Sequence, residues 1–127
     1  MRQPQLLLID DEPALAAFVA HVAEDCGFES VLTSEDRTFR EKFLDQRPDM
    51  VALDLGMPGM DGFETCRRMR EAGSGAYIVA LTGWGQDKDR RRVLRSGFDA
   101  HLTKPADPAQ LEELLATGRL KKQVASG

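Results

Sequence analysis

The chain has 127 residues, 42% of them hydrophobic and 30% charged, which fits a single globular domain of ordinary size. Its formal net charge of -4 argues against nucleic acid as a direct partner. The apolar run Leu6–Ile9 is too short for a signal peptide or a membrane span, so we expect a cytoplasmic protein without membrane insertion. Cys26 and Cys66 lack the spacing of a metal site, and we expect two free, buried thiols.

Short apolar runs alternate with segments of helical periodicity. Strands are expected at residues 6–9, 29–33, 50–53, 77–81 and 99–103, and the apolar runs 6–9, 50–53 and 77–81 are expected to be buried. Helices are expected between Pro13 and Gly27, after Ser34, along the stripe Phe63, Cys66 and Met69, within residues 87–96, and from Pro108 to Gly118. This alternation predicts an α/β fold with a parallel sheet covered by helices on both faces.

The same periodicity predicts which helix residues face solvent and where the last helix ends. Arg67, Arg68 and Arg70 lie off the apolar stripe of their helix, and the run Arg90–Arg92 is typical of a solvated face. We expect Gly118 to end the last helix and the polar, basic tail 118–127 to be loosely ordered. Without a linker or repeat, residues 1–127 are expected to form one domain with a core from about residue 5 to 117.

Polar residues with related chemistry follow the predicted strands. These residues are Asp10-Asp11, Asp54, Thr82 and Lys104. Because the carboxyl ends of parallel strands lie at one edge of a sheet, we expect these side chains to converge. Clustered carboxylates repel unless a cation neutralises them, and hard oxygen ligands without His or Cys favour Mg²⁺, or Mn²⁺, over zinc. An ammonium group and a hydroxyl beside them suit phosphoryl oxygens.

In this order, the residues resemble the receiver domain of two-component response regulators. The resemblance is carried by Asp10-Asp11, Asp54 with the loop 57–62, Thr82-Gly83 and Lys104-Pro105, and it extends from Leu6 to about Ala116. The segment 80–105 is also similar to receivers attached to hybrid sensor histidine kinases. The family implies a flavodoxin-like, doubly wound, five-stranded parallel sheet in the order 2-1-3-4-5, with five helices on its two faces.

The resemblance also implies a role for each site residue. Asp54 would accept the phosphoryl group of a phosphohistidine on a sensor histidine kinase or a histidine phosphotransfer protein. The implied metal ligands are Asp11, Asp54, the backbone carbonyl of Gly56 and, through water, Asp10. The implied phosphate contacts are Lys104, Thr82 and the amide of Gly83. Such a chain is a signalling module, not an enzyme, although it catalyses its own phosphorylation and dephosphorylation.

Two positions depart from the usual family pattern. His101 lies three residues before the lysine, where the family usually has the Tyr or Phe that acts with the threonine, here Thr82, as a switch. Because imidazole gains charge near neutral pH and a phenol does not, we hypothesise a switch that weakens in acid; a surface position without a role is the alternative. Trp84, two residues after Thr82, adds bulk where it can alter the access of water to the phosphate.

Two other classes of protein use similar parts. A magnesium-dependent phosphatase of the haloacid dehalogenase type needs a second Asp two residues after the nucleophile, and Gly56 stands there. A flavin-binding protein needs a phosphate-cradling loop after the first strand, where Asp10-Asp11-Glu12 would repel phosphate. The sequence leaves open the cognate kinase, the output, a monomeric or weakly dimeric state, and whether the chain is part of a larger protein.

Overall fold

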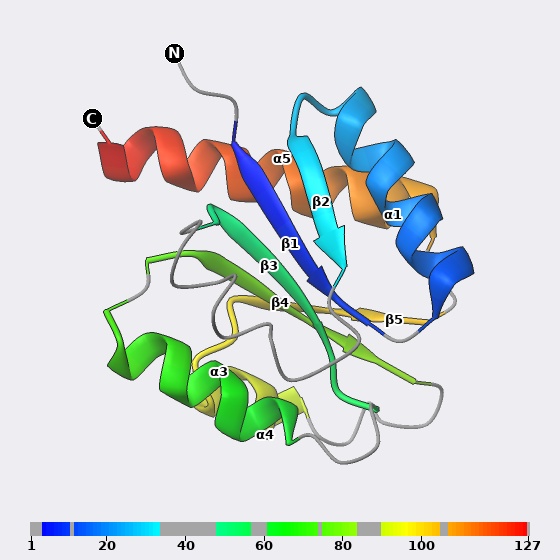
Figure 1. Cartoon of the computed structure of the whole chain (residues 1–127). Helices are drawn as coiled ribbons and strands as arrows, with labels where there is room; N and C mark the ends of the chain where they lie inside the picture. The colour runs from blue at the N-terminus through cyan, green and yellow to red at the C-terminus, as the bar shows by residue number, and fades with distance from the viewer. Residues whose placement is uncertain are drawn as a thin grey trace.

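A parallel five-stranded sheet forms the centre of the computed structural model, which describes residues 4–10, 12–33, 48–56, 61–73, 75–83, 90–104 and 107–126. The strands are β1 (Gln5–Ile9), β2 (Glu29–Thr33), β3 (Met50–Asp54), β4 (Tyr77–Thr82) and β5 (Ala100–Thr103). They lie in the order β2-β1-β3-β4-β5, and every neighbouring pair is parallel (Figure 1). The expected parallel α/β sheet is confirmed, and its strand order is the one that the resemblance implied.

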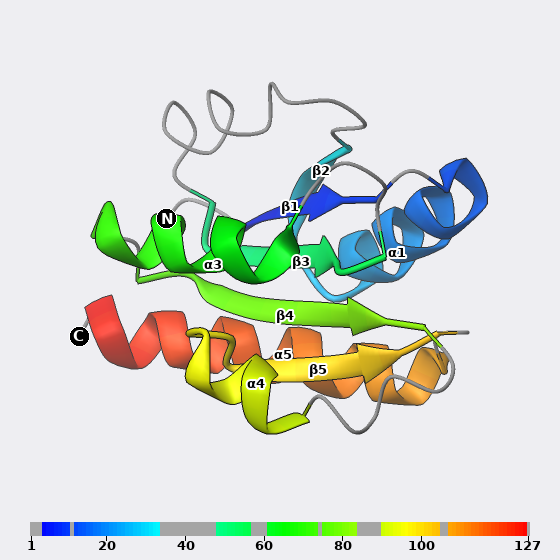
Figure 2. The ribbon, with the colours of Figure 1, turned by 90° about the horizontal axis from the view of Figure 1, so that it is seen from below.

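Helices cover both faces of this sheet. They are α1 (Pro13–Asp25), α3 (Gly62–Glu71), α4 (Arg90–Arg95) and α5 (Pro108–Ser126). Helices α1 and α5 pack on one face, and α3 and α4 lie on the other (Figures 1 and 2). The helix expected after Ser34 falls outside the described residues. In the part of the chain that the structure describes, no helix is long and apolar enough to cross a membrane.

The alternation of side chains along each strand divides the core into two clusters. Leu6 and Leu8 of β1 point towards α1 and α5, whereas Leu7 and Ile9 point towards α3 and α4. Because β1, β3 and β4 are covered on both sides, their residues are almost uniformly apolar and buried. Cys66 is buried in the second cluster, as expected, whereas Cys26 packs against the first cluster and is only half-buried. The two cysteines lie on opposite faces of the sheet and form no disulfide with each other.

Helix α5 does not end at Gly118, which corrects the expectation from the sequence. It continues to Ser126 through residues that mostly favour helix. A Cβ atom added at Gly118 would lie 3.0 Å from the Met50 sulfur and 3.0 Å from Cδ1 of Tyr77. Glycine at this position therefore allows the helix to approach the start of β3 and β4 closely, instead of terminating the helix.

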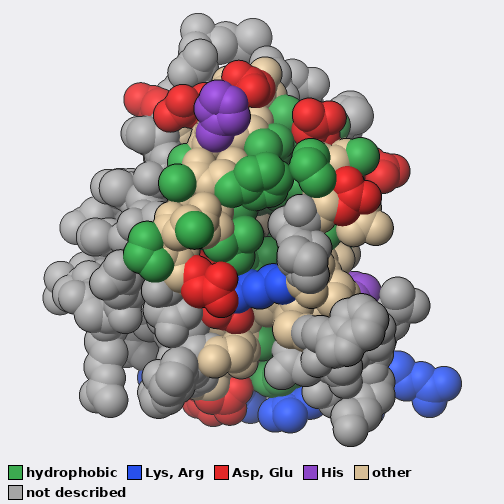
Figure 3. All heavy atoms as spheres, turned by 90° about the vertical axis from the view of Figure 1, so that its right-hand side faces the viewer, with side chains coloured by type: hydrophobic (Ala, Val, Ile, Leu, Met, Phe, Trp, Pro, Cys, Tyr) green, Lys and Arg blue, Asp and Glu red, His purple; other side chains and the backbone are tan. Residues whose placement is uncertain are grey.

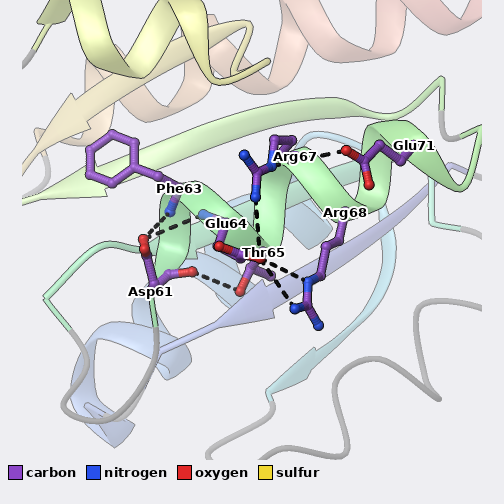
Figure 4. Close-up of polar contacts among 7 residues, drawn as sticks. All are labelled: Asp61, Phe63, Glu64, Thr65, Arg67, Arg68 and Glu71. Atoms are coloured by element: carbon purple, nitrogen blue, oxygen red, sulfur yellow. Dashed lines mark hydrogen bonds and ion pairs between the residues drawn. The ribbon is translucent and has the colours of Figure 1, made fainter.

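Helix α3 begins at the N-cap residue Asp61 and carries ion pairs on its exposed face. The Asp61 side chain accepts hydrogen bonds from the amides of Phe63 (3.0 Å) and Glu64 (3.3 Å), which fixes the first turn (Figure 4). Arg67 and Arg68 form ion pairs with Glu64 at 3.2 and 3.1 Å. Both arginines are exposed, as expected from the sequence.

Arg70 is not a solvent-facing residue of α3, contrary to the expectation from its place on the helix. Its guanidinium donates to the carbonyl oxygens of Gly97 (2.9 Å) and Ala76 (2.6 Å), and to the Asp99 carboxylate (2.6 Å). Only 25% of the Arg70 side chain is exposed. The same Asp99 oxygen accepts from the amide of Ile78 (2.9 Å). Arg70 thus links α3 to the start of β4 and to the turn between α4 and β5.

Candidate functional site

Four of the predicted site residues meet at the carboxyl edge of the sheet. Asp10 directly follows β1, Asp54 ends β3, Thr82 ends β4, and Lys104 directly follows β5. The Lys104 ammonium lies 3.0 Å from an oxygen of Asp10 and 3.0 Å from an oxygen of Asp54. Asp11 falls outside the described residues.

Backbone groups orient both carboxylates. The amide of Glu12 donates to Asp10 Oδ1 at 2.8 Å, and the amide of Gly56 donates to Asp54 Oδ1 at 2.8 Å. A Cβ at position 56 would lie 3.4 Å from that Asp54 oxygen, so a glycine leaves the space beside the carboxylate open. The other oxygen of each carboxylate, Oδ2, faces the Lys104 ammonium.

Burial and like charge oppose the ionisation of Asp10. Asp10 is 1% exposed and Asp54 is 4% exposed. Desolvation by burial raises the pKa of Asp10, and the charge of Asp54 acts in the same direction, against the hydrogen bonds from the Glu12 amide and Lys104. Burial also opposes the charge of Lys104, but its hydrogen bonds and attraction to Asp54 and Asp10 together outweigh burial and raise the pKa of Lys104. Lys104 therefore stays cationic between two carboxylates.

Thr82 brings an unused hydrogen-bonding group to the same edge. It is 1% exposed, and its hydroxyl makes no hydrogen bond within the part of the chain that the structure describes. A buried hydroxyl without a partner loses free energy, and such groups are often positioned for a ligand. The backbone carbonyl of Thr82 accepts from the Lys104 amide at 2.7 Å, which ties the ends of β4 and β5 together.

Among the remaining predicted residues, the structure describes Gly83 and His101. Gly83 follows β4 and is partly buried. His101 pairs with Ala80 in the sheet and is partly exposed, on the face opposite to buried Leu102. Because Ala80 and Thr82 alternate with Leu81, this face is also the face of Thr82, but a switching role for His101 stays a prediction. Trp84 and Pro105 fall outside the described residues.

Glu12 is a site neighbour that the sequence argument did not assign. Its carboxylate lies 3.9 Å from the Lys104 ammonium, and 62% of its side chain is exposed. Its place directly after Asp10-Asp11 is the signal that could have identified it. Figure 3 views the molecule from the side towards which the arrowheads of β3 and β4 point, where acidic and basic side chains adjoin below a group of apolar side chains.

Curated relatives match the chain over most of its length. An uncharacterized 14.6 kDa protein of Leptolyngbya boryana is 33% identical over 117 residues, which are 91% of this chain and 89% of that protein. The regulator RpaA of Synechocystis is 35% identical, over 91% of this chain and 48% of RpaA. The response regulator MtrA of Mycolicibacterium smegmatis is 38% identical, over 87% of this chain and 48% of MtrA.

The last two relatives bear on the expected partners. The chain spans about half the length of RpaA and of MtrA, and both proteins are named as DNA-binding. The expectation that the protein has no nucleic-acid partner is therefore not supported.

Solved structures agree with the sequence matches. The receiver domain of AraT from Geobacillus stearothermophilus superposes with a TM-score of 0.88 at 26% identity, over 99% of this chain and 100% of that domain. A receiver domain from Clostridium thermocellum, at 24% identity and a TM-score of 0.85 over 96% of this chain and 98% of that one, shows the same fold. A model of the response regulator receiver domain matches residues 6–116, and the chain belongs to that family.

Proposed function

We propose that the chain receives a phosphoryl group on Asp54 from a phosphohistidine of a sensor histidine kinase or a histidine phosphotransfer protein. A carboxylate oxygen of Asp54 forms the new bond to phosphorus. The bond between phosphorus and the imidazole nitrogen breaks, and its electron pair returns to that nitrogen. The arrangement of Asp54 at a strand end, with Lys104 at 3.0 Å, is the observation that carries this proposal.

The neighbouring groups supply charge and hydrogen bonds to the transferred group. Lys104 keeps its positive charge because its pKa is raised, so it can balance the charge that develops on the phosphoryl oxygens. The unpartnered hydroxyl of Thr82 can donate to one of these oxygens, with the amide of Gly83 as a second donor. Both groups are held by the edge of the sheet, which limits the reorganisation that the reaction needs.

We propose that a magnesium ion binds at this edge. Asp11, Asp54 and the carbonyl of Gly56 would hold it directly, and Asp10 through water. The fit rests on hard oxygen donors and on the raised pKa of Asp10, which a nearby divalent cation would lower. When bound, Mg²⁺ or Mn²⁺ would neutralise the carboxylates and the incoming phosphoryl oxygens.

The proposed consequence is a changed binding surface, not turnover of a substrate. We propose a signalling module without an enzymatic product, whose phosphorylated form alters its contacts with an output partner. Gly56, in place of a second Asp, disfavours the alternative of a phosphatase of the haloacid dehalogenase type. The cytoplasmic location and the monomeric or weakly dimeric state stay predictions.

The direct test is phosphorylation of the Asp54→Asn variant by labelled acetyl phosphate with Mg²⁺. We expect the variant to fold normally and to take up no label, because it lacks the nucleophile. Asp25→Asn, which alters an exposed carboxylate on α1, is the matched control and should label like the parent. Equal, stable labelling of the Asp54→Asn variant and the parent would contradict the assignment.

A further inference from the structure

The charged side chains of the site differ sharply in their exposure to solvent. The side chains of Asp10 and Asp54 are 0% and 6% exposed, and that of Lys104 is 18% exposed. The side chain of Glu12 is 62% exposed, and its carboxylate still lies 3.9 Å from the Lys104 ammonium. Among the charged groups that the structure describes at this edge, Glu12 is therefore the one that solvent reaches most freely.

Glu12 orients the site through its backbone, not through its side chain. Its amide donates to Asp10 Oδ1 at 2.8 Å, and its carbonyl accepts from the Ala16 amide at 3.0 Å in the first turn of α1. Although Glu12 is the N-cap residue of α1, its side chain makes no capping hydrogen bond with the described residues of that helix. Substitution by glutamine therefore keeps both backbone contacts and the length of the side chain, and it removes the charge.

The side chains that the structure describes give this edge an excess of negative charge. The carboxylates of Asp10, Glu12 and Asp54 adjoin one ammonium, that of Lys104. Asp10 and Asp54 each lie 3.0 Å from this ammonium, whereas Glu12 lies at the longest distance from it. The charge of Glu12 is therefore the least compensated of the three, and it acts through solvent on any anion that approaches Asp54.

We propose that Glu12 selects phosphoryl donors by their charge and disfavours small dianionic donors. This inference rests on the proposed function and concerns the donors that the same site accepts. Acetyl phosphate is a dianion near neutral pH, whereas phosphoramidate is a monoanion because its nitrogen is protonated. Phosphohistidine has the same phosphorus–nitrogen bond as phosphoramidate, and its imidazole carries a positive charge when it is protonated. Glu12 therefore favours nitrogen-linked donors over free acyl phosphates.

Both small donors transfer the same group to a carboxylate oxygen of Asp54. With acetyl phosphate, the bond between phosphorus and the acetyl oxygen breaks, its electron pair stays on that oxygen, and acetate leaves. With phosphoramidate, the bond between phosphorus and nitrogen breaks, its electron pair goes to nitrogen, and ammonia leaves. Because the leaving group is the same in a variant and in the parent, the ratio of their rates reports on charge alone.

The size of the effect follows from the exposure of Glu12. An exposed charge changes the free energy of a neighbouring charge only modestly, which corresponds to a factor of about two in rate for each charge of the donor. This factor applies once to a monoanion and twice to a dianion, so the expected changes are about twofold and about fourfold. Both should disappear at about 1 M salt, where screening acts over about 3 Å.

The test measures the second-order rate constants for phosphorylation of Glu12→Gln by acetyl phosphate and by phosphoramidate. Mass spectrometry of the intact protein follows the product, and Mg²⁺ saturation is verified for each variant, so that metal affinity does not enter the rates. The matched control is Glu24→Gln. Glu24 is an exposed glutamate nearer the carboxyl end of the same helix, so this variant has the same net charge as Glu12→Gln.

At low salt, we expect Glu12→Gln to react about fourfold faster than Glu24→Gln with acetyl phosphate and about twofold faster with phosphoramidate. At about 1 M salt the two variants should react equally. Equal rates of the two variants at low salt would overturn this inference alone. The same holds for a change of equal size with both donors, which a role of Glu12 in positioning Lys104 would produce. A parent that neither donor phosphorylates would overturn the proposed function as well.

Discussion

Replacement of Arg70 by Met tests how the structure holds the side of the sheet that carries α3 and α4. The change removes donors to the Gly97 and Ala76 carbonyls and to Asp99, but it keeps an unbranched apolar stem in place of the arginine stem. Each hydrogen bond that involves a charged group contributes about 1.5–3 kcal/mol, and these contributions do not add fully. Arg70 and Asp99 are 25% and 23% exposed, so water can replace part of the loss. We therefore expect a decrease of about 3 kcal/mol in the free energy of unfolding.

Urea denaturation followed by circular dichroism measures this decrease. The matched control is Arg67→Met on the same helix, whose ion pairs are exposed and should contribute less than about 0.5 kcal/mol. Arg70→Lys should recover little of the loss, because one ammonium cannot replace the fork of a guanidinium that reaches three acceptors. If Arg70→Met and Arg67→Met unfold within about 0.5 kcal/mol of each other, the structural role given to Arg70 is wrong.

Two further predictions concern the edge of the site and the last helix. A carboxyl group whose pKa is raised on folding stabilises the protein most at a pH below its pKa in the unfolded chain, and it loses that contribution as the pH rises through its pKa in the folded protein. Without metal, Asp10→Asn should therefore raise the free energy of unfolding by about 1 kcal/mol at pH 7 and by little near pH 3. Urea titrations in a metal chelator check this, and an equal effect at both pH values would contradict it. Gly118→Leu should lower stability by about 2 kcal/mol through overpacking against Met50 and Tyr77, while Gly118→Ala should change it little because added helix propensity offsets the tight contact. Thermal unfolding compares the two variants, and a leucine variant as stable as the alanine variant would mean that α5 does not approach the sheet so closely.

The strands and the site edge were predictable because both depend on local sequence. A buried parallel strand is a short apolar run, and the run must stop where the chain reaches solvent. The first polar residue after each run is therefore placed at the carboxyl edge without any knowledge of the tertiary structure, as with Asp10 and Asp54. The parallel arrangement then brings these residues together from strands that are distant in the sequence.

The remaining features depend on contacts that no local pattern contains. Arg70 lies 27 residues before Gly97 and 29 before Asp99, so helical periodicity assigned it to solvent with Arg67 and Arg68. Gly118 looked like a helix end because a sequence does not distinguish a terminating glycine from one that admits a neighbouring side chain. The contact of the Arg92 guanidinium with the Phe63 ring, 4.0 Å from its centre, was not predicted either, because an arginine-rich helix is usually a solvated one.

The two edges of the sheet differ in how their charges are compensated, and this difference separates the fold from the function. Near the amino end of β4, Arg70 and Asp99 are of opposite sign and directly hydrogen-bonded, so removing either leaves acceptors or donors without a partner. At the carboxyl edge, one ammonium of Lys104 is shared between Asp10 and Asp54, and burial still raises the pKa of Asp10. Because removal of the Asp10 charge should stabilise the fold, this carboxylate does not serve stability. The free energy lost by burying its charge can be regained when a cation binds. The opposite signs expected for Arg70→Met and Asp10→Asn follow from this arrangement.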